Sequence, residues 1–338
     1  MVSCSQPAPA PSPAPSSAPA SSKVFELTFN AVWPEAWPGT PAMKRFISEA
    51  DARSGGRIKM TFYPAGGLGT NGESIENLGK GVIDITGDSP LFVAGAFPIS
   101  TLATLPFLFS PQASQPAIFW DLYYRGYLKA EYDRRNMVPL AMVGTEVFRL
   151  FLKGDKITKL DDFKGRLIRD PGGYWSQFLK ALGASPTVVI PPEVYNALER
   201  GMVSGGVMGS GLSKAFKMDE QWTSVLMEGF GQTANGIYMN RDKWYALPDD
   251  LKAIMLELRP EFEGWLLDGM DQGDRSYTAE MAAKGIELYR LDPAELKKWQ
   301  DAAKPILAGW ITDMNSQSIP GQEIMDIVLK DLQKYNWR

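Results

Sequence analysis

Two arginines, Arg149 and Arg169, lie within or at the end of apolar segments that have the composition of β-strands, 147–152 and 166–169. An unpaired guanidinium beside such a segment is costly, because it keeps its charge at any ordinary pH. A carboxylate is its natural partner, since the two planar groups form two parallel hydrogen bonds. The pair therefore predicts a binding site for a small organic acid.

The alternative interpretation of these arginines is structural. Either side chain could form an ion pair within the protein, and Asp170 and Glu146 are the candidate partners. From the residues alone, both interpretations stay open.

Composition limits the function classes. The chain has 338 residues, of which 44% are hydrophobic and 22% charged, which is typical of a globular protein large enough for two lobes. The net charge of −4 gives no support for nucleic-acid binding. The chain contains no histidine, which excludes Ser-His-Asp and Cys-His catalysis and nearly all histidine-based metal sites. We expect no metal, no cofactor and no enzymatic activity.

The N-terminal segment has a composition that cannot form a core. Residues 5–22 are almost entirely Pro, Ala and Ser, so we expect residues 1–23 to act as a disordered tether. The only cysteine, Cys4, follows small residues, as in the lipid-bearing cysteine of a bacterial lipoprotein, although the charged and apolar regions of a full signal peptide are absent. We expect a lipid anchor at Cys4; the alternative is an untethered tail.

Strand and helix patterns alternate along the chain, which predicts an α/β fold with a mainly parallel sheet and helices on both faces. Helices are expected over 73–80, over the aromatic-rich segment 114–136 and over a long segment from Pro248 to Lys284, with one more capped by Thr40 and others starting at Asp292 and Ile319. Strands are expected at 25–29, 58–62, 82–86, 137–143, 147–152, 166–169, 187–190, 203–208 and 235–240.

A glycine motif gives a rival function. Gly67, Gly69 and Gly72 match the G-x-G-x-x-G dinucleotide pattern, and Asp88 lies at a suitable distance beyond it. An NAD-dependent oxidoreductase would follow from this motif. Three observations weaken it. Pro64, Ala65 and Gly66 stand between the strand and the motif, where the fingerprint requires a tight turn, and that strand is the second rather than the first. No acid–base group accompanies the glycines.

Other candidates each have a plain and a functional interpretation. Glu73 opens a helix, where a negative charge is favoured, or it accepts a hydrogen bond from a ligand. Trp33 and Trp37 either cover a ligand or attach their loop to the core. Ser210 lies between two glycines without the spacing of a nucleophile elbow, so a turn or a close approach of the backbone to a ligand is expected there.

Several segments together resemble the solute receptors of TRAP (tripartite ATP-independent periplasmic) transporters. The likeness covers about Phe25 to Leu332 and is carried by the order and spacing of the segments. These are 54–58 (SGGRI), 63–69 (YPAGGLG), 81–84 (GVID), 105–109 (LPFLF), 159–169 (KLDDFKGRLIR), 182–184 (LGA), 192–201 (PEVYNALERG) and 239–248 (MNRDKWYALP).

The resemblance implies an α/β fold of two periplasmic-binding-protein-like lobes, each a mixed sheet flanked by helices, with one long helix shared by both. Lobe I would comprise 24–146 and 237–276, and lobe II 147–236 and 277–338. The resemblance implies that Arg169 is the arginine that binds the ligand carboxylate in this family. Arg149 falls at the position where some members have a second such arginine. Glu73, Asp88 and Ser89 would lie in the cleft.

One segment departs from the family pattern. Where the family often has polar groups for ligand or cation, this chain has Val207 and Met208. We therefore expect a monocarboxylate with an apolar or aromatic body, contacted by Met208, Trp33 and Phe148, with Ser210 nearby. The resemblance also implies an extracytoplasmic receptor, monomeric or homodimeric, that delivers its ligand to TRAP permease subunits in the membrane. An acid-sensing receptor domain is the remaining alternative.

Overall fold

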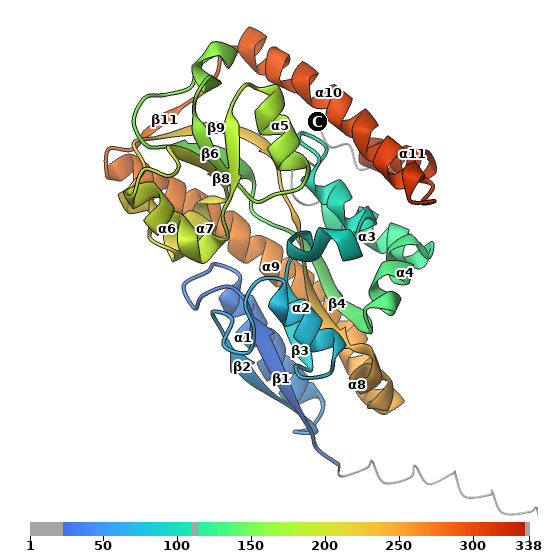
Figure 1. Cartoon of the computed structure of the whole chain (residues 1–338). Helices are drawn as coiled ribbons and strands as arrows, with labels where there is room; N and C mark the ends of the chain where they lie inside the picture. Colours follow the sequence, from blue (N-terminus) through green and yellow to red (C-terminus); the bar gives the residue numbers. More distant parts are fainter. Residues whose placement is uncertain (1–22, 110–113, 335–338) are drawn as a thin grey trace, which may run out of the picture.

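Two β-sheets, each flanked by helices, form the two halves of the molecule (Figure 1). The structure is a computed structural model that describes residues 23–109 and 114–334. Cys4 and, apart from Lys23, the expected tether lie outside these residues. Among them, no helix has the length and hydropathy needed to cross a membrane.

The first sheet has the strand order β2-β1-β3-β10-β4. Its strands are β1 (Phe25–Ala31), β2 (Ile58–Tyr63), β3 (Ile85–Asp88), β4 (Met137–Gly144) and β10 (Ala234–Asn240). β10 runs antiparallel to both of its neighbours, β3 and β4, whereas β1 is parallel to β2 and β3. The sheet is therefore mixed rather than mainly parallel, because a strand from late in the chain is inserted between β3 and β4.

The second sheet has the order β11-β9-β5-β8-β6-β7. Its strands are β5 (Phe148–Leu152), β6 (Leu167–Asp170), β7 (Ser185–Val188), β8 (Gly205–Met208), β9 (Ser224–Gly231) and β11 (Glu287–Tyr289). β5 is antiparallel to β8 and β9, while β6 is parallel to β7 and β8. Both sheets are thus mixed, as the family resemblance implies.

Helices cover both sheets. They are α1 (Thr40–Arg53), α2 (Glu73–Gly79), α3 (Ser114–Tyr124), α4 (Tyr127–Arg134), α5 (Tyr174–Ala181), α6 (Pro191–Glu199), α7 (Ser210–Ala215), α8 (Arg241–Ala246), α9 (Asp249–Ala283), α10 (Pro293–Ser316) and α11 (Gly321–Lys334). Four short 3₁₀ helices complete the set, η1 (Pro90–Ala96), η2 (Ile99–Thr104), η3 (Leu160–Phe163) and η4 (Met218–Glu220).

The long helix α9 joins the two halves, and it contacts α1 and β4 beside the first sheet and α7 and β11 beside the second. Its buried residues Met255, Leu258, Phe262, Leu266 and Met270 recur every three or four positions, as an amphipathic helix requires. Met255 to Met270 pack in one core cluster with the first sheet. The shared long helix is confirmed.

Apart from α9, the chain passes between the sheets at two places, 145–147 after β4 and 232–233 before β10. The two crossings are tied side by side, because the Thr145 amide donates to the Thr233 carbonyl (3.0 Å) and the Thr233 amide donates to Thr145 Oγ1 (3.0 Å). These two crossing segments and the helix α9 are therefore the covalent links between the halves.

Three expected elements differ in the structure. The segment 114–136 forms two helices rather than one, because Gly126 adopts φ +96° between α3 and α4. The strand expected at 82–86 begins at Ile85, and α1 is capped by Gly39 rather than Thr40, whose hydroxyl donates to the Pro34 carbonyl (3.1 Å). β9, which the sequence analysis did not predict, supplies an inner strand of the second sheet.

Candidate functional site

A small cavity of about 40 Å³ lies where the two sheets meet the crossings. It is lined by residues of both halves and of the crossings: Val32, Trp33, Asn71, Ser89, Leu91, Phe92, Thr145, Phe148, Arg169, Pro171, Pro191, Leu212, Phe216, Thr233 and Asn235. Most of these side chains are apolar, and Arg169 is the only charged one. The volume is well below the roughly 150 Å³ of a cavity that holds benzene, so the halves are closed tightly on each other.

Arg169 is held in this cavity by the backbone of the neighbouring strands. It is 1% exposed and lies on β6, between β7 and β8. Its Nε donates to the Val189 carbonyl (2.9 Å) and its Nη1 to the Val207 carbonyl (2.8 Å). A guanidinium has five N–H groups, so three of them, including both on Nη2, are left for another partner.

No carboxylate of the described residues lies within ion-pair distance of Arg169. The adjacent Asp170 is turned elsewhere, and its Oδ1 accepts from the Gly172 amide (2.6 Å) and the Ser176 hydroxyl (2.7 Å). Burial lowers the pKa of Arg169 to about 10, although the negative charge of Asp170 acts in the opposite direction and raises it. The side chain therefore remains charged at neutral pH, in a site where the described residues supply no counter-charge within the distance of an ion pair.

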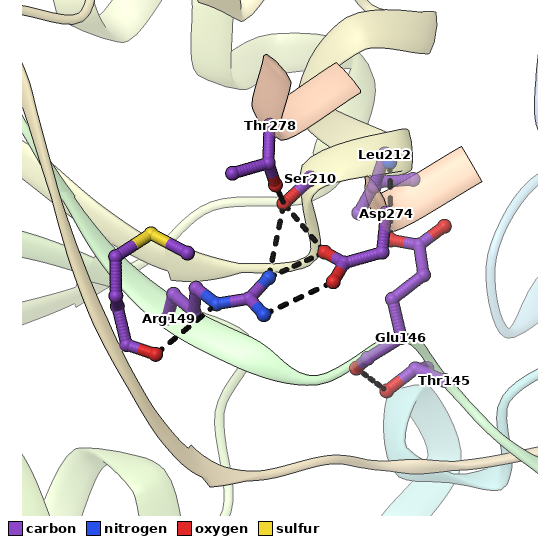
Figure 2. Close-up of polar contacts among 8 residues, drawn as sticks. Thr145, Glu146, Arg149, Ser210, Leu212, Asp274 and Thr278 are labelled. Carbon is purple, nitrogen blue, oxygen red and sulfur yellow. Dashed lines mark hydrogen bonds and ion pairs between the residues drawn. The ribbon is translucent and has the colours of Figure 1, made fainter. Parts of the chain in front are cut away.

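Arg149, in contrast, has an internal partner. Its Nη1 and Nη2 bind the two carboxylate oxygens of Asp274 on α9, the second at 3.0 Å (Figure 2). Nη1 also donates to Ser210 Oγ (3.2 Å), and Nε to the Met227 carbonyl (3.4 Å). Both hydrogen-bonding edges of this guanidinium are thus occupied, and Arg149 does not line the cavity. A structural ion pair is present, but its partner is Asp274 rather than the expected Asp170 or Glu146.

Glu146 is a buried carboxyl group beside the crossing after β4. Its Oε1 accepts from Trp37 Nε1 (3.0 Å) and its Oε2 from the Leu212 amide at the start of α7 (3.2 Å). Burial raises the pKa of Glu146 to about 7, although these hydrogen bonds act to lower it. Trp37 in turn stacks on Trp33, with ring centroids 4.5 Å apart. Glu146 therefore connects the loop of the first half that carries Trp33 and Trp37 to α7 of the second half.

The eight residues predicted as ligand contacts divide into two groups. Arg169, Trp33, Phe148 and Ser89 all line the cavity, although the Ser89 hydroxyl already donates to the Ala234 carbonyl (2.6 Å).

The other four, Arg149, Glu73, Met208 and Ser210, do not line it. Met208 is fully buried in a separate core cluster with Phe151 and Trp222, because alternate residues of β8 point to opposite faces of the sheet. Ser210 hydrogen-bonds Asp274 Oδ1 (2.8 Å). Glu73 Oε2 accepts from the amide (3.2 Å) and hydroxyl (3.3 Å) of Thr70, which matches its plain helix-start interpretation.

Several residues that line the cavity were missed by the sequence analysis. Asn71, Thr145, Leu212, Phe216 and Asn235 come from four separate segments. Only the folded arrangement brings them together, and none carries a local pattern that indicates a site.

The glycine motif does not form a phosphate cradle. The Gly72 amide donates to Asp88 Oδ2 (2.8 Å), as does the Ser74 hydroxyl (2.7 Å), and the Leu68 amide donates to Asn30 Oδ1 (2.9 Å). A carboxylate thus occupies the start of α2, where the fingerprint would place a pyrophosphate. The dinucleotide interpretation is wrong for this loop. Among the described residues, no group of three or more His, Cys, Asp or Glu side chains is arranged to hold a metal ion.

Comparisons with known proteins agree on the family. The sequence profile described as "Bacterial extracellular solute-binding protein, family 7" matches residues 29–313. Over 279 residues, the chain is 27% identical to "Outer membrane transporter protein TsaT" of Comamonas testosteroni, with 80% of each protein covered.

Solved structures show the same fold. A TRAP solute-binding protein from Rhodoferax ferrireducens, in complex with copurified benzoate, gives a TM-score of 0.86 at 23% identity, covering 93% of this chain and 99% of that one. A marine metagenome TRAP protein described as specific for aromatic acid ligands, in complex with 3-hydroxybenzoate, gives 0.85 at 22% identity with the same coverage. The profile match over most of the chain shows that it belongs to family 7 of the bacterial extracellular solute-binding proteins, the non-enzymatic receptors of TRAP transporters.

Proposed function

We propose that this receptor captures a monocarboxylate with an apolar or aromatic body between its two halves, with Arg169 as the partner of the carboxylate. One observation carries the proposal: a fully buried guanidinium borders an apolar cavity and has no counter-ion within 4 Å among the described residues. A buried ion that lacks a counter-charge is unfavourable, so an anionic ligand that pairs with it in good geometry is favoured.

The character of the cavity favours an apolar body for the ligand. Trp33 and Phe148 line the cavity together with the arginine, as do Leu212 of α7 and Phe216, which directly follows that helix. Pockets of this kind bind ligands by apolar contact and use a few polar groups for orientation. The benzoate and 3-hydroxybenzoate found in the two structural relatives are acids of this chemical class.

Binding of such a ligand requires the halves to separate, because the closed cavity is too small for an aromatic ring. We propose a hinge movement of lobe I (24–146 and 237–276) against lobe II (147–236 and 277–338), with bending at the two crossings. The closed receptor would then deliver its ligand to the TRAP permease subunits. Anchoring through Cys4 would keep the receptor at the membrane surface.

The function can be tested with the purified, ligand-stripped protein. Thermal unfolding would be measured with a panel of benzoate and hydroxybenzoates, short aliphatic monocarboxylates, C4-dicarboxylates, uronates and, for the rival function, NAD. Mass spectrometry of small molecules that copurify with the protein would supply an independent identification. We expect aromatic monocarboxylates to stabilise the protein most, because a ligand that binds only the folded state raises its stability. Stabilisation by NAD, or by none of the acids, would contradict the proposal.

A further inference from the structure

One polar side chain in the cavity has a buried atom without a hydrogen-bond partner. Asn235 is 3% exposed and lines the cavity from β10, and its Nδ2 has no partner among the described residues. Buried amide groups are nearly always hydrogen-bonded, because leaving one unpaired costs most of its desolvation energy. An exception that faces a ligand cavity points to a group on the ligand.

The neighbouring polar side chains have partners within the protein. Asn71 Nδ2 donates to Asp88 Oδ1 (3.1 Å), and the Ser89 hydroxyl donates to the Ala234 carbonyl. Thr145 Oγ1 accepts from the Thr233 amide. Asn235 therefore differs from these three in having a buried polar atom that nothing in the described protein satisfies.

Asn235 and Arg169 reach the cavity from different sheets. Asn235 pairs with Val143 of β4 in the first sheet, whereas Arg169 pairs with Thr187 of β7 in the second. A ligand whose carboxylate is held by Arg169 on one side of the closure therefore presents its body to the side that carries Asn235.

We infer that Asn235 recognises a second polar substituent, a hydroxyl or carbonyl group, on the body of the acid. This inference rests on the proposed function. A carboxamide has a donor and an acceptor and exchanges them by half a turn, so it can bind either substituent. Asn235 thereby sets the preference of the receptor for a hydroxylated ring over the unsubstituted one. The carboxylate end of the ligand is the same in both cases.

Calorimetry on the intact chain tests this inference with benzoate, 3-hydroxybenzoate and 4-hydroxybenzoate. The variant is Asn235→Leu, which has the same number of side-chain heavy atoms and no polar group. Benzoate is the internal control because it lacks the hydroxyl, and thermal unfolding reports whether the variant folds. We expect the wild type to bind one hydroxybenzoate about tenfold more tightly than benzoate, the value of one hydrogen bond. In the variant this ratio should fall to about one while benzoate affinity is kept or improved.

The outcomes separate this inference from the proposed function. If the wild type binds benzoate but shows no preference for either hydroxybenzoate, the role of Asn235 is refuted and the receptor function stands. A preference that survives Asn235→Leu refutes it equally. If the wild type binds no aromatic acid, the proposed ligand class fails and this inference fails with it. Should Asn235→Leu not fold, Asn235→Ala is titrated with the same three acids, and the ratio of hydroxybenzoate to benzoate affinity is read in the same way.

Discussion

The buried ion pair between Arg149 and Asp274 makes a sharp prediction for stability. The two side chains are 12% and 15% exposed, and they connect β5 to α9. Of the partners among the described residues, Asp274→Ala leaves the guanidinium of Arg149 with only the Ser210 hydroxyl and the Met227 carbonyl. Removing one member of such a pair costs about 3–5 kcal/mol; because this pair keeps some exposure, we expect about 3 kcal/mol.

Removing both charges should restore most of this loss. In the double variant Arg149→Met with Asp274→Leu, neither charge remains, and apolar side chains of similar size occupy the site. Urea unfolding of the wild type, Arg149→Met, Asp274→Leu and the double variant, followed by tryptophan fluorescence, gives the coupling energy. Additive losses, with the double variant at least as unstable as the sum of the single variants, would refute the assignment of a buried, mutually dependent pair.

The same double variant tests the role of Arg149 in ligand binding. Since its guanidinium is bound by Asp274 and lies outside the cavity, we expect the affinity for carboxylates to change by less than about threefold. A loss of tenfold or more would show that Arg149 contacts the ligand after all, as the sequence analysis predicted.

Two further predictions concern stability. Gly264→Ala and Gly269→Ala form a matched pair on α9: an added Cβ at Gly264 meets no atom within 4 Å, whereas at Gly269 it would lie 2.7 Å from the Pro38 carbonyl oxygen. We expect the first to raise the free energy of unfolding by roughly 0.5–1 kcal/mol, through helix propensity, and the second to lower it by about 1–3 kcal/mol; equal effects in urea unfolding would contradict the close approach. Burial raises the pKa of both Glu131 and Glu146 to about 7. The folded state therefore keeps the two carboxyl protons at pH values above 4.5, where the unfolded state has begun to release them. Their contribution to stability is therefore complete below about pH 4.5 and is lost as the pH rises from there through 7, by about 3 kcal/mol for each group. Glu146→Gln should flatten this decline, and a slope equal to that of the wild type would count against a buried, protonated Glu146.

Local patterns were sufficient for much of the fold. The helical period of the residues after Pro248 predicts α9, since one apolar face is buried along most of its length. β9 was missed because Glu228 and two glycines interrupt its apolar run, although the strand is satisfied by pairing with β5 and β11. Such pairing is a long-range property that no local pattern contains.

In the candidate site, too, some features could be predicted from local sequence and others depend on long-range contacts. Arg169 could be named as a candidate from the sequence because a charged residue in an apolar strand is unusual and because it falls in a family motif. The partner of Arg149 could not be found, since Asp274 lies 125 residues away and only the packing of α9 brings it near. Asn235 lies in a strand with no charge and no motif, and its unpaired amide appears only once the strand is placed in the sheet.

The most direct test of the account is the discrimination between an acid and its neutral amide. The aromatic acid that stabilises the wild type most, and the corresponding primary carboxamide, would be titrated by calorimetry into the wild type, Arg169→Met and Arg169→Lys. If Arg169 binds the carboxylate, Arg169→Met should lose about two to three orders of magnitude in affinity for the acid and its preference for acid over amide. Arg169→Lys should also bind poorly, because the planar fork is lost. Wild-type affinity for the acid in Arg169→Met would contradict the central claim.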